Sequence, residues 1–253
     1  MIHDNPNGQA VEIAALEGEF YTTVLERLHR TLMPRSYLEI GTSTGSSLAL
    51  ASCASVAIDP GFMLANDVVG KKPLCALFQM PSDRFFEAHD PTRILNRAVD
   101  MAFLDGMHLA EFLLRDFMNI ERYCRPNSLV MLHDCIPGDV FMAERDASSE
   151  RRQRFSKNPT SWTGDVWKVV LALKQYRPDL AMLALDAAPT GLIIITNLDP
   201  ASTALSLQYG EITAWFRSLD LENYGIERYM DEIGVASTKT LSTRDDIAKY
   251  YWL

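Results

Sequence analysis

The sequence lacks several features that would assign it to a specialised class of protein. Its 253 residues contain only four cysteines, none of them in a CxxC pair, which argues against a disulfide framework or a zinc ribbon. No run approaches the roughly 20 apolar residues of a membrane span, and the first residues lack the basic start and apolar run of a secretory signal. We therefore expect a cytoplasmic protein with reduced thiols that acts away from the membrane.

Basic residues are scarce relative to acidic ones. Lys and Arg number 24 against 33 Asp and Glu, which gives a formal net charge of −9. Nothing in the sequence compensates the repulsion that phosphates would meet across such a surface, and the basic stretch ERRQRFSK at 150–157 is typical of a solvated helix face. We expect a small-molecule partner, with no nucleic acid and no membrane.

Apolar residues are abundant, at 47% of the chain, so a sizeable core can be buried. No internal repeat, low-complexity tract or Gly/Ser linker divides the sequence, which favours a single domain over residues 1–253. Its core is expected at about 35–198. A helix at about 10–33 precedes the core and stops before Pro34, and a mostly helical extension at about 200–253 follows it.

Short apolar runs alternate with helical stretches through the core. Alternation of this kind predicts a parallel sheet with right-handed crossovers and helices on both faces. After a further helix at 165–177, residues 180–198 resemble two strands joined by a tight Pro/Gly turn, so the last strand should run antiparallel. The predicted fold class is α/β, a Rossmann-like three-layer sandwich whose mostly parallel, seven-stranded sheet ends in an antiparallel hairpin. The first five strands are expected at 36–41, 55–60, 73–79, 99–105 and 127–134, with helices at 43–54, 85–98 and 110–124.

The first predicted strand runs into a glycine-containing turn, YLEIGTSTGSS at 37–47. Gly41 and Gly45 allow a tight turn and a close approach to a ligand, and free N–H groups at a following helix start can face an anionic group. The turn departs from the dinucleotide pattern GxGxxG, because Ser43 stands at the middle glycine position. Asp59, which ends the second strand, can accept hydrogen bonds from both hydroxyls of a ribose. A purely structural turn, and an aspartate that only opens the DPG turn, remain as alternatives.

Acids and histidines follow the fourth and fifth strands. Asp105 and His108 lie in FLDGMH, and His133 and Asp134 lie in VMLHD. Because ligands of parallel sheets bind beyond the strand ends, the two aspartates can converge on one cation such as Mg²⁺. Histidine has the unperturbed pKa nearest neutrality, so His108 can remove a proton from a hydroxyl. Alternatively, the acids only orient histidines or backbone amides, and His108 only caps or packs against its own helix.

Together with FQMPSDRFF after the third strand and the terminal hairpin, these motifs resemble the class I S-adenosylmethionine-dependent methyltransferases. The D-G-x-H and H-D pair is similar to the small bacterial group described as methyltransferase family 24, and the resemblance covers about residues 35–198. It implies methyl transfer from S-adenosylmethionine to a small-molecule acceptor, with a hydroxyl oxygen as the leading choice. By resemblance, the cofactor is lined by Glu39, Gly41, Thr42, Ser43 and Gly45 at its methionine end, Ser47 at the following helix start, Asp59 at the ribose, Ser82 and Asp83 at the adenine, and Asp105 near the sulfonium.

The same resemblance suggests catalytic roles. His108 is the leading base and His133 the second, with Asp105 beside them, and Asp105 with Asp134 forms the hypothetical metal site. Catechol-type relatives place Asp-Asn where this chain has Asp134-Cys135. Competing hypotheses are an inactive nucleoside-cofactor-binding protein, an NAD-dependent oxidoreductase, which the missing GxGxxG disfavours, and a metal-dependent hydrolase.

Two regions after the fifth strand have less definite interpretations. In SWTGDVWKVV at 161–170, Thr163 or Asp165 could cap the following helix, or Asp165, Trp167 and Lys168 could form part of an acceptor wall. The aromatic residues of the tail are interpreted as core or as a subunit contact. Dimerisation through the N-terminal helix or the tail is a hypothesis, and the motifs do not identify the acceptor.

Overall fold

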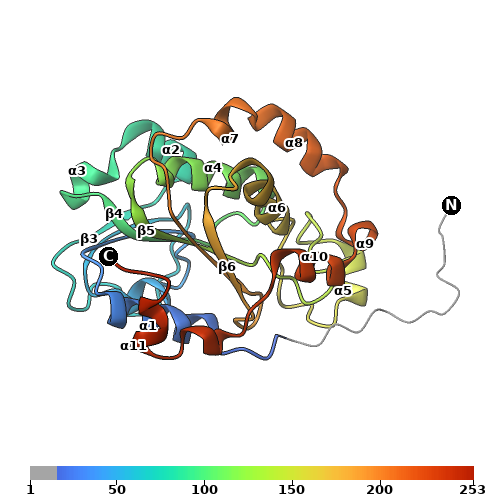
Figure 1. The fold of residues 1–253 in the computed structure, drawn as a ribbon, viewed down its shortest axis with the longest axis horizontal. Coiled ribbons are helices and arrows are strands. Elements are labelled where there is room, and N and C mark those ends of the chain that lie inside the picture. Colours follow the sequence, from blue (N-terminus) through green and yellow to red (C-terminus); the bar gives the residue numbers. More distant parts are fainter. Residues whose placement is uncertain (1–15) are drawn as a thin grey trace, which may run out of the picture.

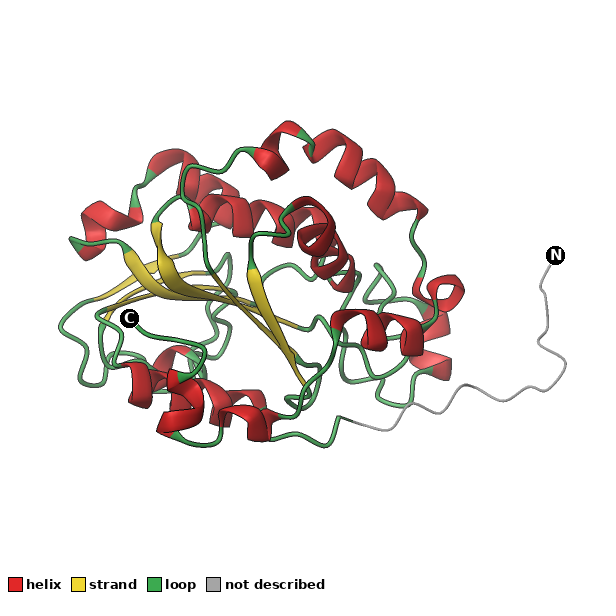
Figure 2. Cartoon of the chain, in the orientation of Figure 1, coloured by secondary structure: helices red, strands yellow, loops and turns green. Residues whose placement is uncertain are grey.

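A seven-stranded sheet forms the centre of the protein, with helices on both of its faces (Figures 1 and 2). The computed structural model describes residues 16–253, so the first part of the helix expected at 10–33 lies outside the described residues. The predicted three-layer α/β fold is confirmed. Its strands are β1 Ser36–Ile40, β2 Ala54–Ile58, β3 Cys75–Phe78, β4 Val99–Leu104, β5 Cys124–His133, β6 Ala181–Leu185 and β7 Leu192–Thr196.

The strand order is β3-β2-β1-β4-β5-β7-β6, and the first five strands are parallel. β7 runs antiparallel to both of its neighbours, with His133 opposite Leu192, which confirms the predicted terminal hairpin. The order reverses between β1 and β4. Crevices at the carboxyl ends of strands on either side of such a reversal are where ligands bind in open α/β sheets.

Each face of the sheet has its own helical layer (Figure 2). One face packs against α2 Ser82–Ala88, α3 Pro91–Leu95, α4 Ala110–Glu121, α6 Trp167–Tyr176, α7 Ala204–Leu207 and α8 Tyr209–Ser218. The opposite face packs against α1 Tyr21–Leu32, a 3₁₀ turn at Leu48–Leu50, a second 3₁₀ turn at Thr238–Leu241 and α11 Arg244–Ala248. A smaller cluster joins α6 to α9 Leu221–Tyr224 and α10 Ile226–Ile233, and the short α5 covers Glu150–Phe155. Among the described residues, no helix has the length and apolar character needed to cross a bilayer.

The two-residue alternation of β4 and β5 determines which helical layer each side chain meets. Leu104 packs with the α4 and α6 layer, whereas Phe103 and Met131 pack with the α1 layer. His133 lies two residues after Met131 and therefore shares its side of the sheet. The N-terminal helix consequently lies on the same side as the polar residues that end β5.

Three predicted helices differ from the structure. The helix at 43–54 is wrong, because Ser43 and Gly45 adopt left-handed backbone angles (φ +47° and +80°) and only the 3₁₀ turn fits before β2. The stretch at 85–98 forms α2 and α3 instead of one helix, since Asp90 precedes a proline and is extended. Residues 16–20 precede α1 and are not helical, so the N-terminal helix begins later than predicted.

Candidate functional site

The glycine turn after β1 is held directly against the tip of β4. Gly41 has φ +86°, and a Cβ atom there would lie 2.0 Å from the carbonyl oxygen of Asp105. Any other residue would therefore push the two strand tips apart. The following Leu48–Leu50 turn is too short to supply the helix start that the sequence suggested, so the backbone of the 41–45 turn itself must face any ligand.

Asp59 ties this turn to the segment that follows β2. One of its carboxylate oxygens accepts a hydrogen bond from the Ser43 N–H and the other accepts one from the Gly61 N–H, both at 2.7 Å. Each oxygen keeps a further lone pair, so a hydroxyl donor can still bind it. The structure thus brings Asp59 to the predicted place beside the turn, and its contact with a ribose stays a prediction.

Ser82 and Asp83 lie at the start of α2, beyond β3. The Asp83 carboxylate is held in a forked ion pair by Arg115, with N–O distances of 2.8–3.1 Å, and Arg115 also donates to the Tyr209 hydroxyl. An adenine contact by Asp83 would therefore have to share the carboxylate with Arg115. The adenine role of both residues stays a prediction.

Two buried oxygens beneath the turn lack a well-formed hydrogen bond. Within the described residues, Oε1 of Glu39 and Oγ1 of Thr42 make none of good geometry, although Tyr37 donates to the other Glu39 oxygen at 2.7 Å. Burial raises the pKa of Glu39 to about 7, against the opposing effects of the nearby Tyr37, Thr42 and Ser47 hydroxyls. Ser47 is also buried here. Buried polar atoms are rarely left unsatisfied, so this region favours a ligand that supplies donors and acceptors.

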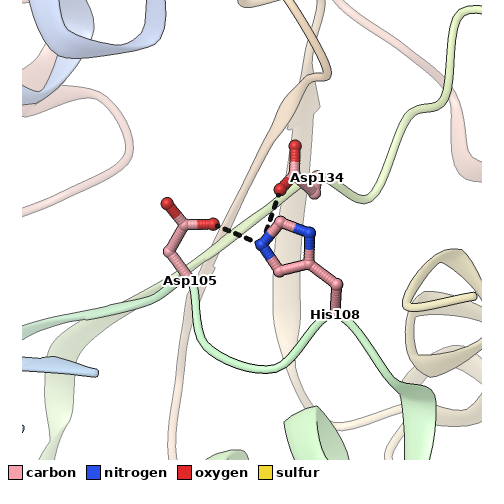
Figure 3. A group of neighbouring side chains, drawn as sticks. All are labelled: Asp105, His108 and Asp134. Atoms are coloured by element: carbon pink, nitrogen blue, oxygen red, sulfur yellow. Dashed lines mark ion pairs between the residues drawn. The ribbon is translucent and has the colours of Figure 1, made fainter. Parts of the chain in front are cut away.

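Four polar side chains, here termed the reactive cluster, meet beyond β4 and β5: Asp105, His108, His133 and Asp134. His108 Nε2 lies 3.1 Å from Asp134 Oδ2 and 3.5 Å from Asp105 Oδ1, between the two carboxylates (Figure 3). His133 Nδ1 lies 3.1 Å from Asp105 Oδ1 and 3.5 Å from Asp134 Oδ1. The convergence predicted from the strand positions is therefore present, and it includes both histidines.

The segment before α6 holds His108 in place. The His108 backbone is left-handed (φ +54°), its ring stacks on Trp162 at 5.2 Å, and its Nδ1 lies 2.7 Å from the Trp162 carbonyl oxygen. A Cβ atom at Gly164 would lie 1.8 Å from the His108 carbonyl oxygen, so this packing requires glycine. α4 begins at Ala110, and the Ala110 N–H donates a hydrogen bond to the Asp165 carboxylate and not to His108. His108 therefore points into the cluster and does not cap its own helix.

The charges of the cluster act strongly on one another. Burial favours neutral imidazole, yet the hydrogen bond to Asp105 and the charge of Asp134 raise the pKa of His108 to about 9. For His133, burial is likewise outweighed by the charges of Asp105 and Asp134, which raise its pKa to about 10. Burial alone would raise the pKa of Asp105, but both histidines outweigh it and hold the pKa of this carboxyl well below the usual range. Both imidazoles are therefore mainly protonated near neutral pH, beside an ionised Asp105.

Thr190 and Tyr21 belong to the same site, and no motif indicated them. Thr190, in the β6–β7 turn, donates a hydrogen bond to Asp134 Oδ1 and lies 3.4 Å from His133 Nε2. Tyr21 begins α1, and its ring centroid lies 4.1 Å from that of His133. The available signal was topological: β7 pairs with β5, so the turn before β7 must lie beside the end of β5.

Neither Thr163 nor Asp165 caps α6, whose N-cap is Val166, so that interpretation is wrong. Asp165 instead accepts a hydrogen bond from the N–H of Ala110 and pairs with Arg145 and Lys168. Asp165, Trp167 and Lys168 border a cavity of about 610 Å³ between α6 and the C-terminal helices. Their role in an acceptor wall stays a prediction.

A family model agrees with the central part of the chain. Residues 38–135 match the Methyltransf_24 family, described as a methyltransferase domain. The match runs from β1 to the residue after Asp134, so it includes the 41–45 turn and the whole reactive cluster. The resemblance predicted from the sequence is confirmed. A comparison with curated proteins found no match.

Solved structures of low sequence identity share the fold. The O-methyltransferase TomG from Streptomyces achromogenes, solved with S-adenosylmethionine, is 18% identical over 70% of this chain and 78% of its own, with a TM-score of 0.50. An O-methyltransferase from Bacillus cereus, solved with S-adenosylhomocysteine, is 14% identical over 71% of this chain and 80% of its own, also with a TM-score of 0.50. The methyltransferase PaMTH1 from Podospora anserina is 13% identical over 71% of this chain and 78% of its own, with a TM-score of 0.50. At these identities, the likeness establishes a shared fold.

Proposed function

We propose that this protein, whose residues 38–135 match a methyltransferase-domain family model, transfers a methyl group from S-adenosylmethionine to a hydroxyl oxygen of a small molecule. The observation that carries the proposal is the position of the reactive cluster. Its acids and imidazoles lie directly beyond the 41–45 turn, where Gly41 touches the backbone of Asp105. A binding turn and a proton-transferring group are thus side by side. A cytoplasmic location belongs to the same proposal.

The residues of the turn fit the cofactor in chemical type. Asp59 has lone pairs left for ribose hydroxyls, and the unpartnered atoms of Glu39 and Thr42 suit the amino and carboxyl groups of the methionine end. The turn exposes small residues, which suits the close approach of a nucleoside. The structures of similar fold from Streptomyces achromogenes and Bacillus cereus, solved with S-adenosylmethionine and S-adenosylhomocysteine, support the same choice.

Methyl transfer requires little covalent chemistry from the protein. The donor is already activated, so the chain has to hold the acceptor in line with the methyl group and assist removal of the hydroxyl proton. We assign the proton to Nε2 of His108 in its neutral form, with His133 as the second choice. Because the pKa of His108 is raised to about 9, turnover should increase as the pH rises toward that value. Asp105, Asp134 and Thr190 orient these rings, and the Trp162 carbonyl accepts from His108 Nδ1–H, so that Nε2 faces the cluster.

A divalent cation is a further part of the proposal. Asp105, His108 and Asp134 each offer one ligand atom, and these atoms lie within 4.8 Å of one another. Oxygen-rich sets of this kind suit Mg²⁺ or a similar ion, which would acidify a hydroxyl when bound. With Nδ1 committed to Trp162, a neutral His108 would direct its lone pair at two carboxylates, and only a proton or a cation relieves that repulsion. The same nitrogen cannot bind a cation and accept a proton, so metal dependence decides between these two roles.

Isothermal titration with S-adenosylmethionine and S-adenosylhomocysteine tests the cofactor. We expect micromolar binding, weakened in Asp59→Ala by about 1–3 kcal/mol, the usual cost of leaving buried polar groups unpaired. Asp67→Ala is the matched control, because Asp67 also accepts a backbone N–H in the same loop, but its exposed carboxylate bonds Gly70 and not the 41–45 turn. Absence of binding by folded wild-type protein would refute the proposal, and binding of NAD instead would favour an oxidoreductase. Binding without turnover on any acceptor would favour an inactive binding protein.

A further inference from the structure

Tyr21 lies at the junction between the 41–45 turn and the reactive cluster. It comes from α1, before the segment that matches the methyltransferase domain. Its ring lies 4.1 Å from His133 and 6.0 Å from Phe103, centroid to centroid, and is nearly parallel to the Phe103 ring. The side chain thus forms an aromatic wall on the α1 side of the site.

Carboxyl groups and one imidazole surround Tyr21. The carboxyl groups of Asp105, Asp134 and Glu39 all lie near enough to act on its hydroxyl, Ser46 lies within hydrogen-bonding reach, and the His133 ring packs against the Tyr21 ring. Glu39 and Ser46 belong to the strand and turn that would hold the methionine end, whereas Asp105, His133 and Asp134 belong to the reactive cluster. Between these two sets, the π-face and phenol oxygen of Tyr21 offer partial negative charge to a positively charged group.

The backbone around Tyr21 is fixed from both sides. Its N–H donates to the Ala188 carbonyl at 2.9 Å, and the Ala188 N–H donates to the Glu19 carbonyl at 3.0 Å. The Glu19 N–H in turn donates to the Thr238 hydroxyl at 3.0 Å. The start of α1 is therefore bound to the hairpin turn and to the C-terminal extension, so the Tyr21 ring has a defined position.

We infer that Tyr21 contacts the sulfonium of the methyl donor and makes the site prefer the charged donor over its neutral product. This inference rests on the proposed function. S-adenosylmethionine carries a positive sulfur, whereas S-adenosylhomocysteine carries an uncharged thioether at the same position. An aromatic ring and a phenol oxygen attract the first more than the second. Tyr21 thereby favours release of the product after transfer.

The test is the ratio of the two dissociation constants, measured by isothermal titration without any acceptor. In Tyr21→Leu and Tyr21→Met we expect the preference for S-adenosylmethionine over S-adenosylhomocysteine to fall about three- to tenfold, the fold-change typical of a lost cation–aromatic contact. Phe20→Leu is the matched control, since Phe20 is the exposed neighbour at the same helix start, and it should leave the ratio unchanged. Circular dichroism identifies which of the two variants is folded and therefore informative.

The outcomes separate the two levels of the proposal. Equal weakening of both ligands in the folded variants, or no weakening, would overturn the role of Tyr21 and leave the cofactor assignment intact. Failure of the wild-type protein to bind either compound would overturn both. A fall in the ratio confined to the Tyr21 variants would support the inference, because a purely structural wall would affect the two ligands alike.

Discussion

Replacing Asp165 should destabilise the fold strongly. Asp165 is 1% exposed and accepts from the Ala110 N–H at 2.9 Å, from Arg145 at 2.6 Å and from Lys168 at 2.9 Å. Lys168 is itself only 5% exposed, and it also donates to the Phe216 carbonyl at 2.8 Å. Asp165→Leu would therefore leave a buried ammonium without its counter-charge.

The magnitude follows from these contacts. Removing one partner of a buried ion pair costs about 3–5 kcal/mol, because the other charge stays buried, and the lost contact at the start of α4 adds about 1 kcal/mol. A domain is typically stable by only about 5–15 kcal/mol. In the double variant Asp165→Leu/Lys168→Met, neither charge remains and Arg145 keeps Glu111 as its partner. We expect the double variant to recover about 2–3 kcal/mol relative to Asp165→Leu.

Urea denaturation of the wild type, both single variants and the double variant gives the coupling energy of the pair. Lys168→Met alone should cost less than Asp165→Leu, because Asp165 retains Arg145. A coupling energy below about 0.5 kcal/mol, the usual scatter for independent sites, would refute the reasoning. So would a double variant less stable than Asp165→Leu.

Three further predictions concern pH and the reactive cluster. Burial, with the charge of Lys72, lowers the pKa of His29 to about 4, so the unfolded state binds the proton more readily and stability falls as pH drops from about 6.5 to 4. The loss is about 2 kcal/mol at pH 5. Denaturation at pH 7.5 and pH 5 should show a smaller loss in His29→Leu, and an equal loss in both proteins would contradict the assignment. At the cluster, His108→Ala should lower kcat about 10²–10⁴-fold and change S-adenosylmethionine affinity little, whereas unchanged turnover would exclude His108. Chelation should abolish turnover and Mg²⁺ restore it if the cation site is used, and calorimetric silence with Mg²⁺ would exclude that site.

The sheet could be predicted because its signals are local. β4, VDMAFL, is apolar apart from Asp100 and buried on both faces, and an acid follows directly at Asp105. The second half of β5 is a similar apolar run, LVML, that leads into the His133-Asp134 pair. The convergence of these residues then required only the rule that neighbouring parallel strands end at one edge.

The missed features depend on contacts between distant segments. The 43–54 stretch contains good helix formers, and the left-handed backbone at Ser43 and Gly45 arises from tertiary contacts with Asp59 and the loop that follows β2. Tyr21 has the spacing of an ordinary amphipathic helix, so its place beside His133 is visible only once the α1 layer is assigned to a face of the sheet. Thr190 lies in a turn whose distance from Asp134 is set by the register of β7 on β5.

The hydrogen bonds that join Tyr21 and Glu19 to Ala188 and Thr238 link segments that are synthesised at different times. The five parallel strands are synthesised before Thr190 and Thr238. Thr190, which holds Asp134, follows Asp134 by more than fifty residues, and Thr238, which anchors the start of α1, comes later still. During synthesis, Asp134 and the start of α1 can therefore acquire these hydrogen bonds only after all five parallel strands have been made.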